Sequence, residues 1–357
     1  MGFKKTCVLL LILFVLPLFA WIDAEAVPLR EGSVCTGEFI PVSTPLTDLG
    51  NGEYVRLSTG ATGFSGGLYP DGSNARPPGH ERAGRAISRQ ITPLDPSGVP
   101  SPDGRIVMLS IGMSNTYMEF RGFALMARAD PRLNPAVALV NGAQPGMVAT
   151  EWVDPEAPSW DNVESLLSSG GLSPLQVQVA WIKLTNIYMA QFPQSTQKLQ
   201  DDLKVVVRNL KAKYPNVRLA YLSSRTRSYT YWYGLNPEPG AFETGFAVKW
   251  LVEAQINGDP ELNYHPGNGP VVAPYLSWGP YLWADGLNPR SDGMVWVQED
   301  LVKDCTHPSP KGTQKIGSQL LDFFKNDPTT RSWFVLPYRY YFPVALATGV
   351  IDDPPGP

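Results

Sequence analysis

From Arg105 onwards, short apolar runs alternate with longer amphipathic segments, and this alternation restricts the chain to few architectures. Each run is short and mostly apolar, like strands of a parallel sheet that is covered on both faces. Five runs meet this description, at residues 106–111, 136–140, 177–182, 217–222 and, more weakly, 271–276. Strands that alternate with helical segments are typical of α/β proteins. The pattern therefore predicts an α/β fold with a mainly parallel, five-stranded sheet.

Two of the amphipathic segments carry clear helix signals. Leu199, Leu203, Val206 and Leu210 recur at helical spacing and predict a helix over 196–214. Another helix is expected to begin at Ser309–Pro310, because serine is a common N-cap and proline is favoured at the first helical position. It is expected to end near 327–328, where a proline follows an aspartate.

The composition changes along the chain, and this change divides it into segments. Residues 27–103 are rich in Gly, Pro, Ser and Asn, and turn signals at 66–67, 70–72 and 77–79 interrupt them. We expect an irregular, loop-rich N-terminal extension over 27–103 and the main domain over 104–327. The tail at 328–357 is too broken by prolines to span a membrane, and we expect it to pack on the domain.

The first 26 residues resemble an export signal. Lys4 and Lys5 precede an apolar stretch at 7–21, and Ala24 and Ala26 supply a small-residue cleavage pattern. The alternative is a membrane anchor, but the apolar stretch is shorter than the ~20 residues of a spanning helix. We therefore expect a secreted or periplasmic protein without a stable membrane anchor. The net charge of −4 gives no reason to expect a nucleic-acid partner.

Cleavage of that segment would leave two cysteines, Cys35 and Cys305. Exported proteins commonly join such a pair, so a disulfide is expected, with two free thiols as the alternative. The bond would pin the N-terminal segment beside His307.

Ser114 follows the first predicted strand, directly after Gly112 and Met113. In open α/β sheets, ligands bind at the carboxyl ends of the strands. If a helix starts here, as residues 116–128 allow, Ser114 lies at a helix N-terminus, which favours developing negative charge. Ser114 is therefore a candidate nucleophile. The alternative is an ordinary N-cap serine.

A serine nucleophile needs a base, usually a histidine that is oriented by a carboxylate. The chain has three histidines, and His307 is the one with an acid, Asp304, three residues before it. A tight turn would let Asp304 accept from one imidazole nitrogen while the other faces the serine. The alternative is that both residues merely cap a turn. His80 and His265 are expected to be structural or to contact a ligand.

Two further strand ends offer donors for an oxyanion. One is the segment 140–146, which ends at Gly146, and the other is 181–186, which ends at Asn186. A glycine exposes its backbone N–H and an asparagine supplies a side-chain amide. Either segment by itself is also compatible with a plain turn.

The four blocks together resemble the SGNH (GDSL-like) hydrolase superfamily, over residues 105 to about 325. They are Gly-Met-Ser-Asn ending at Asn115, Asn-Gly-Ala-Gln-Pro-Gly ending at Gly146, Leu-Thr-Asn ending at Asn186, and Asp-Cys-Thr-His ending at His307. The resemblance implies a three-layer α/β/α sandwich and a triad of Ser114, His307 and Asp304. It also implies an oxyanion hole formed by the N–H of Ser114, Gly146 and Asn186.

Two residues depart from the family pattern. Met113 stands where an aspartate is usual, and Leu184 stands where a glycine often precedes the asparagine. Neither change removes a reacting atom. The Gly-Met-Ser-Asn block also resembles the Gly-Gln-Ser-Asn variant of the sialate O-acetylesterase-like branch, whose relatives often remove acetyl groups from sugars. The resemblance thus implies a carbohydrate O-acetylesterase, by analogy at branch level.

Other catalytic classes fit less well. An α/β-hydrolase would need Gly-x-Ser-x-Gly, and Thr116 occupies the second glycine position. The scattered histidines and cysteines have no metal-ligand spacing, so we expect no metal and no cofactor.

Loops after the later strands are rich in aromatic and charged residues. Stacking on sugar rings and hydrogen bonding to hydroxyl groups are possible roles for this set, and filling the core is the alternative. The candidates for substrate binding are Arg225, Tyr229, Trp232, Trp283 and Asp285.

The sequence as a whole predicts a secreted serine esterase that hydrolyses ester-linked acyl groups, acetyl in particular, on carbohydrate. An esterase for lipids or small esters is the alternative within enzymes. A carbohydrate-binding protein that kept the fold without turnover is the alternative outside them, and the departures at Met113 and Leu184 make it conceivable.

Overall fold

A computed structural model describes residues 34–336, and these residues contain a five-stranded, wholly parallel sheet. The strand order is β4-β3-β5-β6-β7. The strands are β3 (Ile106–Gly112), β4 (Val137–Asn141), β5 (Val177–Lys183), β6 (Leu219–Leu222) and β7 (Tyr275–Trp278). The predicted fold class is confirmed.

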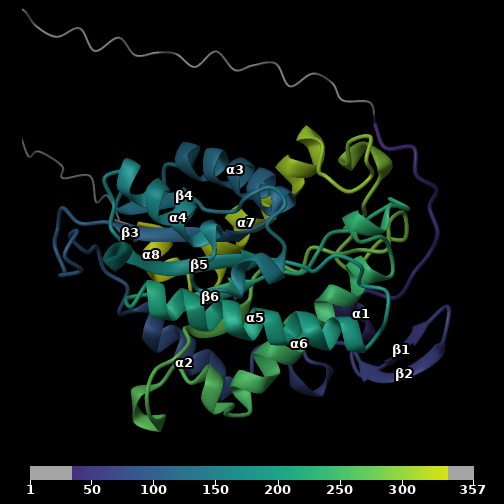
Figure 1. Cartoon of the computed structure of the whole chain (residues 1–357), viewed down its shortest axis with the longest axis horizontal. Helices are drawn as coiled ribbons and strands as arrows, with labels where there is room; N and C mark the ends of the chain where they lie inside the picture. Colours follow the sequence, from purple (N-terminus) through teal and green to yellow (C-terminus); the bar gives the residue numbers. More distant parts are fainter. Residues whose placement is uncertain (1–33, 337–357) are drawn as a thin grey trace, which may run out of the picture. The chain divides into compact units, whose positions relative to one another are not determined.

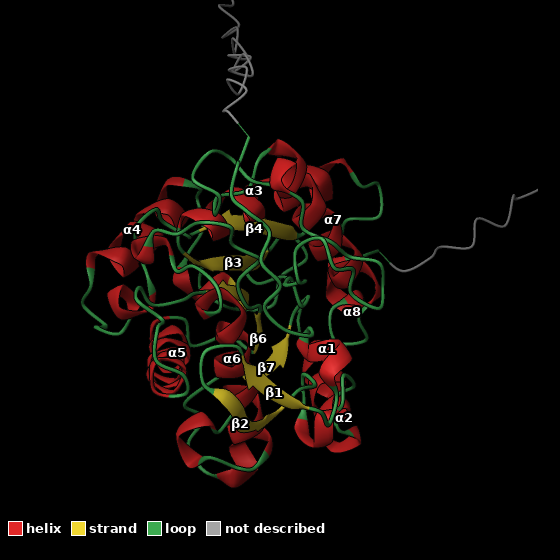
Figure 2. Ribbon diagram, turned by 90° about the vertical axis from the view of Figure 1, so that its right-hand side faces the viewer, coloured by secondary structure: helices red, strands yellow, loops and turns green. Residues whose placement is uncertain are grey.

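Helices cover both faces of the sheet and complete a three-layer α/β/α sandwich. One face packs against α4 (Pro158–Ser169), α5 (Gln194–Lys213) and α6 (Gly240–Ile256), and the other against α2 (Pro78–Ser88), α3 (Ser114–Ala129), α7 (Pro310–Asn326) and α8 (Arg331–Phe334). In Figure 2 the strands run between α4 and α5 on one side and α7, α8 and α2 on the other.

Alternation along β3 shows how one strand serves both layers. Val107, Leu109 and Ile111 belong to the core beneath α4, α5 and α6, whereas Ile106 and Met108 belong to the core beneath α3 and α7. All seven residues of β3 are buried. A strand that is buried on both faces carries a nearly unbroken apolar run, which is why the sequence reveals it.

The strand order creates a topological switch point between β3 and β5. The chain passes from β3 outwards to β4 and then returns to pair β5 with the opposite side of β3. Ligands in open α/β sheets bind at such a switch point. The segments after β3 and β5 begin with Met113 and Leu184, so Ser114 and Asn186 follow the carboxyl ends of these two strands.

The N-terminal extension is less irregular than its composition predicts, and residues 34–103 belong to the same compact unit as the sheet. It forms α1 (Leu46–Leu49), the antiparallel pair β1 (Glu53–Arg56) and β2 (Gly60–Ser65), and α2 (Figure 1). The prediction of a turn at 77–79 is wrong because Pro78 is the first residue of α2, a position where its missing N–H costs nothing. Tyr54 of β1 packs edge-on against Phe242 of α6.

Helix boundaries vary in how well the pattern predicts them. Helix α7 begins and ends where its cap and proline signals place it, and Ser309 accepts a hydrogen bond from Gly312 N. The sequence of helix α6 shows no alternation of apolar and polar faces, because the helix is buried on nearly all sides. The last strand is Tyr275–Trp278, displaced towards the C-terminus from 271–276, because Pro274 cannot donate to a ladder.

The start of the C-terminal tail, up to residue 336, is described. Trp333 and Phe334 of α8 are buried, and Phe334 contacts Phe123 of α3 and Phe324 of α7. Residues 337–357 and the expected signal at 1–26 lie outside the described residues. Within 34–336, none of the helices combines the length and apolarity needed to cross a bilayer.

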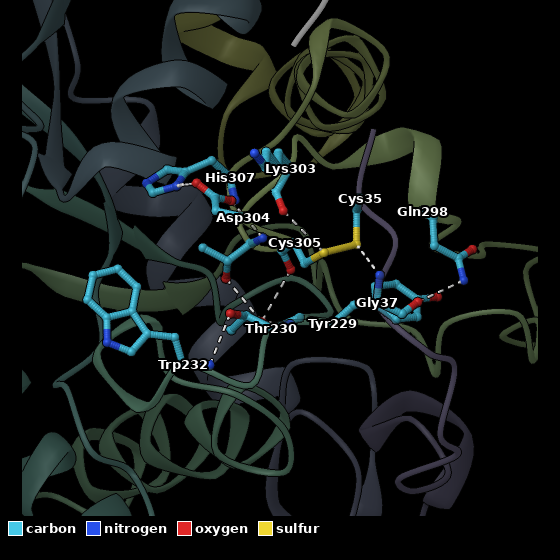
Figure 3. The surroundings of a disulfide bond; sticks show 12 residues. Cys35, Gly37, Tyr229, Thr230, Trp232, Gln298, Lys303, Asp304, Cys305 and His307 are labelled. Carbon is cyan, nitrogen blue, oxygen red and sulfur yellow. Dashed lines mark hydrogen bonds and ion pairs between the residues drawn. A yellow bond between two sulfur atoms is a disulfide. The ribbon is translucent and has the colours of Figure 1, made fainter. Parts of the chain in front are cut away.

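A disulfide joins Cys35 to Cys305 across 270 residues of sequence. Both cysteines are buried, and the backbone N–H of Cys35 also donates to Leu301 O at 3.2 Å. The bond therefore fixes the start of the described chain to the turn that carries Asp304 and His307 (Figure 3).

Replacing Cys35 and Cys305 together by serine should lower the free energy of unfolding by about 2–5 kcal/mol, because the closed loop is long. Denaturant unfolding of the wild type and the double variant, with and without reductant, measures this difference. The reductant should act on the wild type only. Equal midpoints for all samples would show that the bond contributes nothing to stability.

Candidate active site

Ser114 is the first residue of α3 and follows β3 through a sharp turn. Gly112 ends the strand, and Met113 takes an extended conformation as the N-cap residue. The turn needs glycine at 112, because a Cβ there would lie 2.4 Å from the Thr116 Cβ. The sequence thus places the Ser114 hydroxyl at the positive end of a 16-residue helix.

The Ser114 hydroxyl is hydrogen-bonded to His307, which is hydrogen-bonded to Asp304. Ser114 Oγ lies 2.6 Å from His307 Nε2, and His307 Nδ1 lies 2.7 Å from Asp304 Oδ2. Figure 3 shows the imidazole turned towards the Asp304 carboxylate. The structure thus brings together three residues from two segments that are 193 residues apart.

The protonation state of this group follows from the hydrogen bonds on Asp304. Burial raises the pKa of the Asp304 carboxyl, but hydrogen bonds from the His307 ring and from the N–H groups of His307 and Thr306 outweigh burial and hold that pKa below its usual value. The carboxylate is therefore ionised at neutral pH and can only accept. His307 Nδ1 therefore donates to this carboxylate, and Nε2 is the ring nitrogen that faces the Ser114 hydroxyl.

Thr306, between the base and the disulfide, anchors the turn. It is fully buried, its carbonyl accepts from Asn115 Nδ2 at 2.7 Å, and its hydroxyl accepts from Arg225 Nη2 at 2.8 Å. Asn115 is the neighbour of Ser114, so one bond ties the base turn directly to the nucleophile turn. Cys305 takes a left-handed conformation with φ of 62°, which lets the chain reverse within three residues.

The two expected oxyanion segments lie beside the Ser114 turn. Gln144 N donates to Gly112 O at 2.9 Å, which joins the segment after β4 to the end of β3. Ala149 N donates to Thr185 O at 2.9 Å, which joins the same segment to the residues after β5. Gly146 lies between these two contacts with φ of +82°, and a Cβ at this position would meet nothing within 4 Å. Its surroundings are open.

Asn186 is buried with a fixed amide. Its Oδ1 accepts from Thr150 N at 3.2 Å, and its Nδ2 donates to Asp202 Oδ2 at 2.6 Å. Because an amide nitrogen carries two hydrogens, one donor is left for a ligand. Asp202 of α5 is buried and ion-paired with Lys198.

The sequence did not reveal the residues that hold the site. Asn115, Thr306 and Asp202 act through buried hydrogen bonds to partners that are remote in sequence. One signal was available for Asp202, since it lies beside Leu203 on the otherwise apolar face of the predicted helix. An acid at such a position needs a buried partner.

Four of the five expected substrate-binding residues are buried. Trp283 and Asp285 lie in the core, where Asp285 pairs with Arg227 at 2.8 Å and Trp283 donates to Glu238. Tyr229 donates to the Trp296 carbonyl. Arg225 holds Thr306, as described above. The core-filling alternative therefore describes Trp283 and Asp285, whereas Tyr229 is buried but lines a hollow and Trp232 is exposed.

A groove borders the acid of the hydrogen-bonded group. It has a volume of about 350 Å³ and is lined by residues 36–37, 229–232, 235 and 303–305. Tyr231, Trp232 and Tyr233 expose 66%, 68% and 62% of their surfaces, although rings of this size usually pack inside. A second hollow of about 190 Å³ shares Tyr229, Thr230 and Tyr231 with the groove.

His80 and His265 are placed as structural residues. His80 is buried, stacks on Tyr275 and bonds to the Leu276 carbonyl, and burial lowers its pKa to about 4. His265 accepts from Gly267 N in a surface turn. Among the residues that the structure describes, no group of three or more His, Cys, Asp or Glu side chains is arranged to hold a metal ion.

Replacing Gly112 by alanine should lower the free energy of unfolding by about 1–3 kcal/mol, because the new methyl group forces the first turn of α3 away from β3. Gly79→Ala in α2 is the matched control, since a Cβ there meets nothing within 4 Å. Thermal or denaturant unfolding of both variants measures the effect. Equal stability of Gly112→Ala and the control would contradict the close approach.

No family model matches the chain. No curated protein matches it either. The fold is similar to several solved structures. A protein from Slackia heliotrinireducens, described as an SGNH hydrolase, is 14% identical with a TM-score of 0.35, covering 62% of this chain and 99% of that one.

Two carbohydrate esterases are also similar. A family two carbohydrate esterase from Clostridium thermocellum, in complex with cellohexaose, is 16% identical with a TM-score of 0.36, covering 64% of this chain and 66% of that one. A family 3 carbohydrate esterase from Talaromyces cellulolyticus is 14% identical with a TM-score of 0.35, covering 60% and 94%.

Proposed function

We propose that the chain is an SGNH-type serine esterase that hydrolyses ester-linked acyl groups through an acyl-enzyme on Ser114. The unbroken hydrogen-bond chain from Ser114 Oγ through His307 to Asp304, with distances of 2.6 and 2.7 Å, carries this proposal. A serine hydroxyl needs such a base to become nucleophilic at neutral pH, and the base needs such an acid to hold its tautomer.

In the first half-reaction His307 Nε2 takes the Ser114 proton as Oγ bonds to the ester carbonyl carbon. The carbonyl oxygen becomes an oxyanion, for which the N–H groups of Ser114 and Gly146 and the free Asn186 hydrogen are the proposed donors. His307 then gives the proton to the alcohol oxygen, and the bond from carbon to that oxygen breaks.

The second half-reaction reverses these roles with water. His307 takes a proton from water as its oxygen bonds to the acyl carbon. The proton returns to Ser114 Oγ when the acyl-enzyme bond breaks, and the carboxylic acid leaves. Asp304 stays ionised throughout and stabilises the imidazolium form of His307.

We further propose that the substrate is an acylated, specifically acetylated, carbohydrate. The support is the groove beside Asp304, where exposed rings stand next to the polar side chains of Thr36, Thr230 and Lys303. Sugar rings combine an apolar face of C–H groups with a rim of hydroxyls, and such a surface offers partners for both.

We also propose that the protein is exported, with residues 1–26 as its signal peptide. The disulfide between Cys35 and Cys305 supports export, because such bonds persist in oxidising compartments and are rare in the cytosol.

Hydrolysis of an aryl acetate should depend on Ser114 and His307. Ser114→Ala and His307→Ala should each lower kcat by about 10⁴-fold or more, since the members of a triad act as a unit. Purified variants with unchanged unfolding midpoints, assayed beside the wild type, provide the measurement. Equal rates in all three proteins would refute the triad, and no activity in any of them would favour a binding protein without turnover.

Trp232→Ala should raise KM for an acetylated polysaccharide roughly two- to tenfold, the range expected for loss of one aromatic contact, and change kcat/KM for aryl acetate less. Leu166→Ala is the matched control, because Leu166 is an exposed apolar residue on α4 that lines neither hollow. Acetate release from each of the two substrates is measured for both variants and for the wild type. An equal loss on the two substrates would argue against carbohydrate stacking, and higher activity on long-chain esters would favour a lipid substrate.

A further inference from the structure

A fully buried ion pair lies directly behind the nucleophile turn. Lys183, the last residue of β5, donates to both carboxylate oxygens of Glu119 in α3, at 2.5 and 2.7 Å. Both side chains have 0% exposure. No role in the proposed triad or oxyanion hole falls to either residue.

The pair is connected at both ends to the proposed machinery. Glu119 is five residues after Ser114 on α3, and Lys183 is three residues before Asn186. The Lys183 carbonyl also accepts from Thr116 Oγ1 at 2.6 Å. Thr116 and Glu119 are three residues apart and therefore lie on one face of the helix. Lys183 is thus hydrogen-bonded to that face of α3 through both its backbone carbonyl and its side chain.

The energetics argue against a purely stabilising role. Burial raises the pKa of Glu119 and lowers the pKa of Lys183 to about 8, so desolvation outweighs their mutual attraction. A buried ion pair that pays this cost is often no more stable than apolar residues of the same size. The ion pair instead fixes the relative position of α3 and β5. Two charge-assisted hydrogen bonds form in one geometry only, whereas apolar contacts can form in several.

A third buried charge connects this pair to the base. Burial lowers the pKa of Arg225, and attraction to the Glu119 carboxylate opposes this shift in part. Arg225 also donates a hydrogen bond to Thr306, beside His307. The Glu119 carboxylate is therefore attracted both by Lys183 and by Arg225, the cation that holds the base turn.

We propose that Glu119 and Lys183 are positioning residues for the esterase reaction: their ion pair fixes the helix that carries Ser114 relative to the strand end that carries Asn186. The inference rests on the proposed function. The nucleophile and an oxyanion donor must keep one spacing while the substrate carbonyl becomes tetrahedral, and an error of about 1 Å in such a spacing costs on the order of 100-fold in rate. Neither residue touches the reacting atoms.

The test replaces the pair by two methionines, Glu119→Met with Lys183→Met, which removes both charges and keeps much of the volume. The double variant should unfold at nearly the wild-type temperature, while kcat for aryl acetate should fall about 10- to 100-fold with little change in KM. Lys249→Met with Glu253→Met is the matched control, because that pair lies within α6 with its nitrogen 2.6 Å from the carboxylate. Its kcat should stay near the wild-type value.

Glu119→Asp provides a second test that keeps both charges. The aspartate side chain is one methylene shorter than glutamate, so the ion pair can form only if α3 and β5 come closer to each other. We expect a lower kcat at unchanged KM for this variant too. A kcat within about twofold of the wild type for both variants would overturn the inference, as would a rise in KM with kcat unchanged.

Assays of Ser114→Ala in the same series distinguish a failure of the positioning inference from a failure of the proposed esterase function. If Ser114→Ala is inactive and the methionine pair is fully active, positioning is wrong and the esterase proposal stands. If Ser114→Ala is as active as the wild type, the proposed function is wrong and the inference that rests on it is overturned with it.

Discussion

The hydrogen bond from Asn115 to the Thr306 carbonyl is the contact on which the arrangement of the site depends. It joins the turn after β3 to the turn before α7, and these turns carry Ser114 on one side and Asp304 with His307 on the other. Arg225 holds the Thr306 hydroxyl from a third segment. Because Thr306 is fully buried, water cannot compete for these bonds. The disulfide at Cys305, which is also buried, holds the same turn from the N-terminal segment.

The sheet topology explains why four distant segments meet at this point. The chain reverses its direction of progress across the sheet between β3 and β5, which makes their carboxyl ends the switch point of the sheet. The segment after β4 is hydrogen-bonded to both sides of this switch point, through Gly112 and Thr185. Three of the segments thus follow β3, β4 and β5, and the fourth precedes α7.

Buried polar groups connect the helices to the segments that carry the site. Asp202 orients the Asn186 amide from α5, and the pair of Glu119 and Lys183 joins α3 to β5. In each case a helix on one face of the sheet is hydrogen-bonded to a strand end at the carboxyl edge. The two helical layers therefore hold the site from opposite sides, while Tyr231, Trp232 and Tyr233 of the loop after β6 are exposed.

The sequence alone determined the features that depend on local pattern. The sheet strands followed from buried apolar runs, helix α7 from its cap and prolines, the candidate Ser114 from its position after a strand, and the candidates Asp304 and His307 from their spacing of three residues. These features could be read because each one depends on spacing along the chain. Tertiary structure decided which side chains face solvent: Trp283 and Asp285 are buried and Trp232 is not, although all three stand in similar loops. It also paired Asp202 with Asn186 and Glu119 with Lys183, because a buried polar group takes the partner that the fold brings within reach, and sequence spacing does not encode that partner.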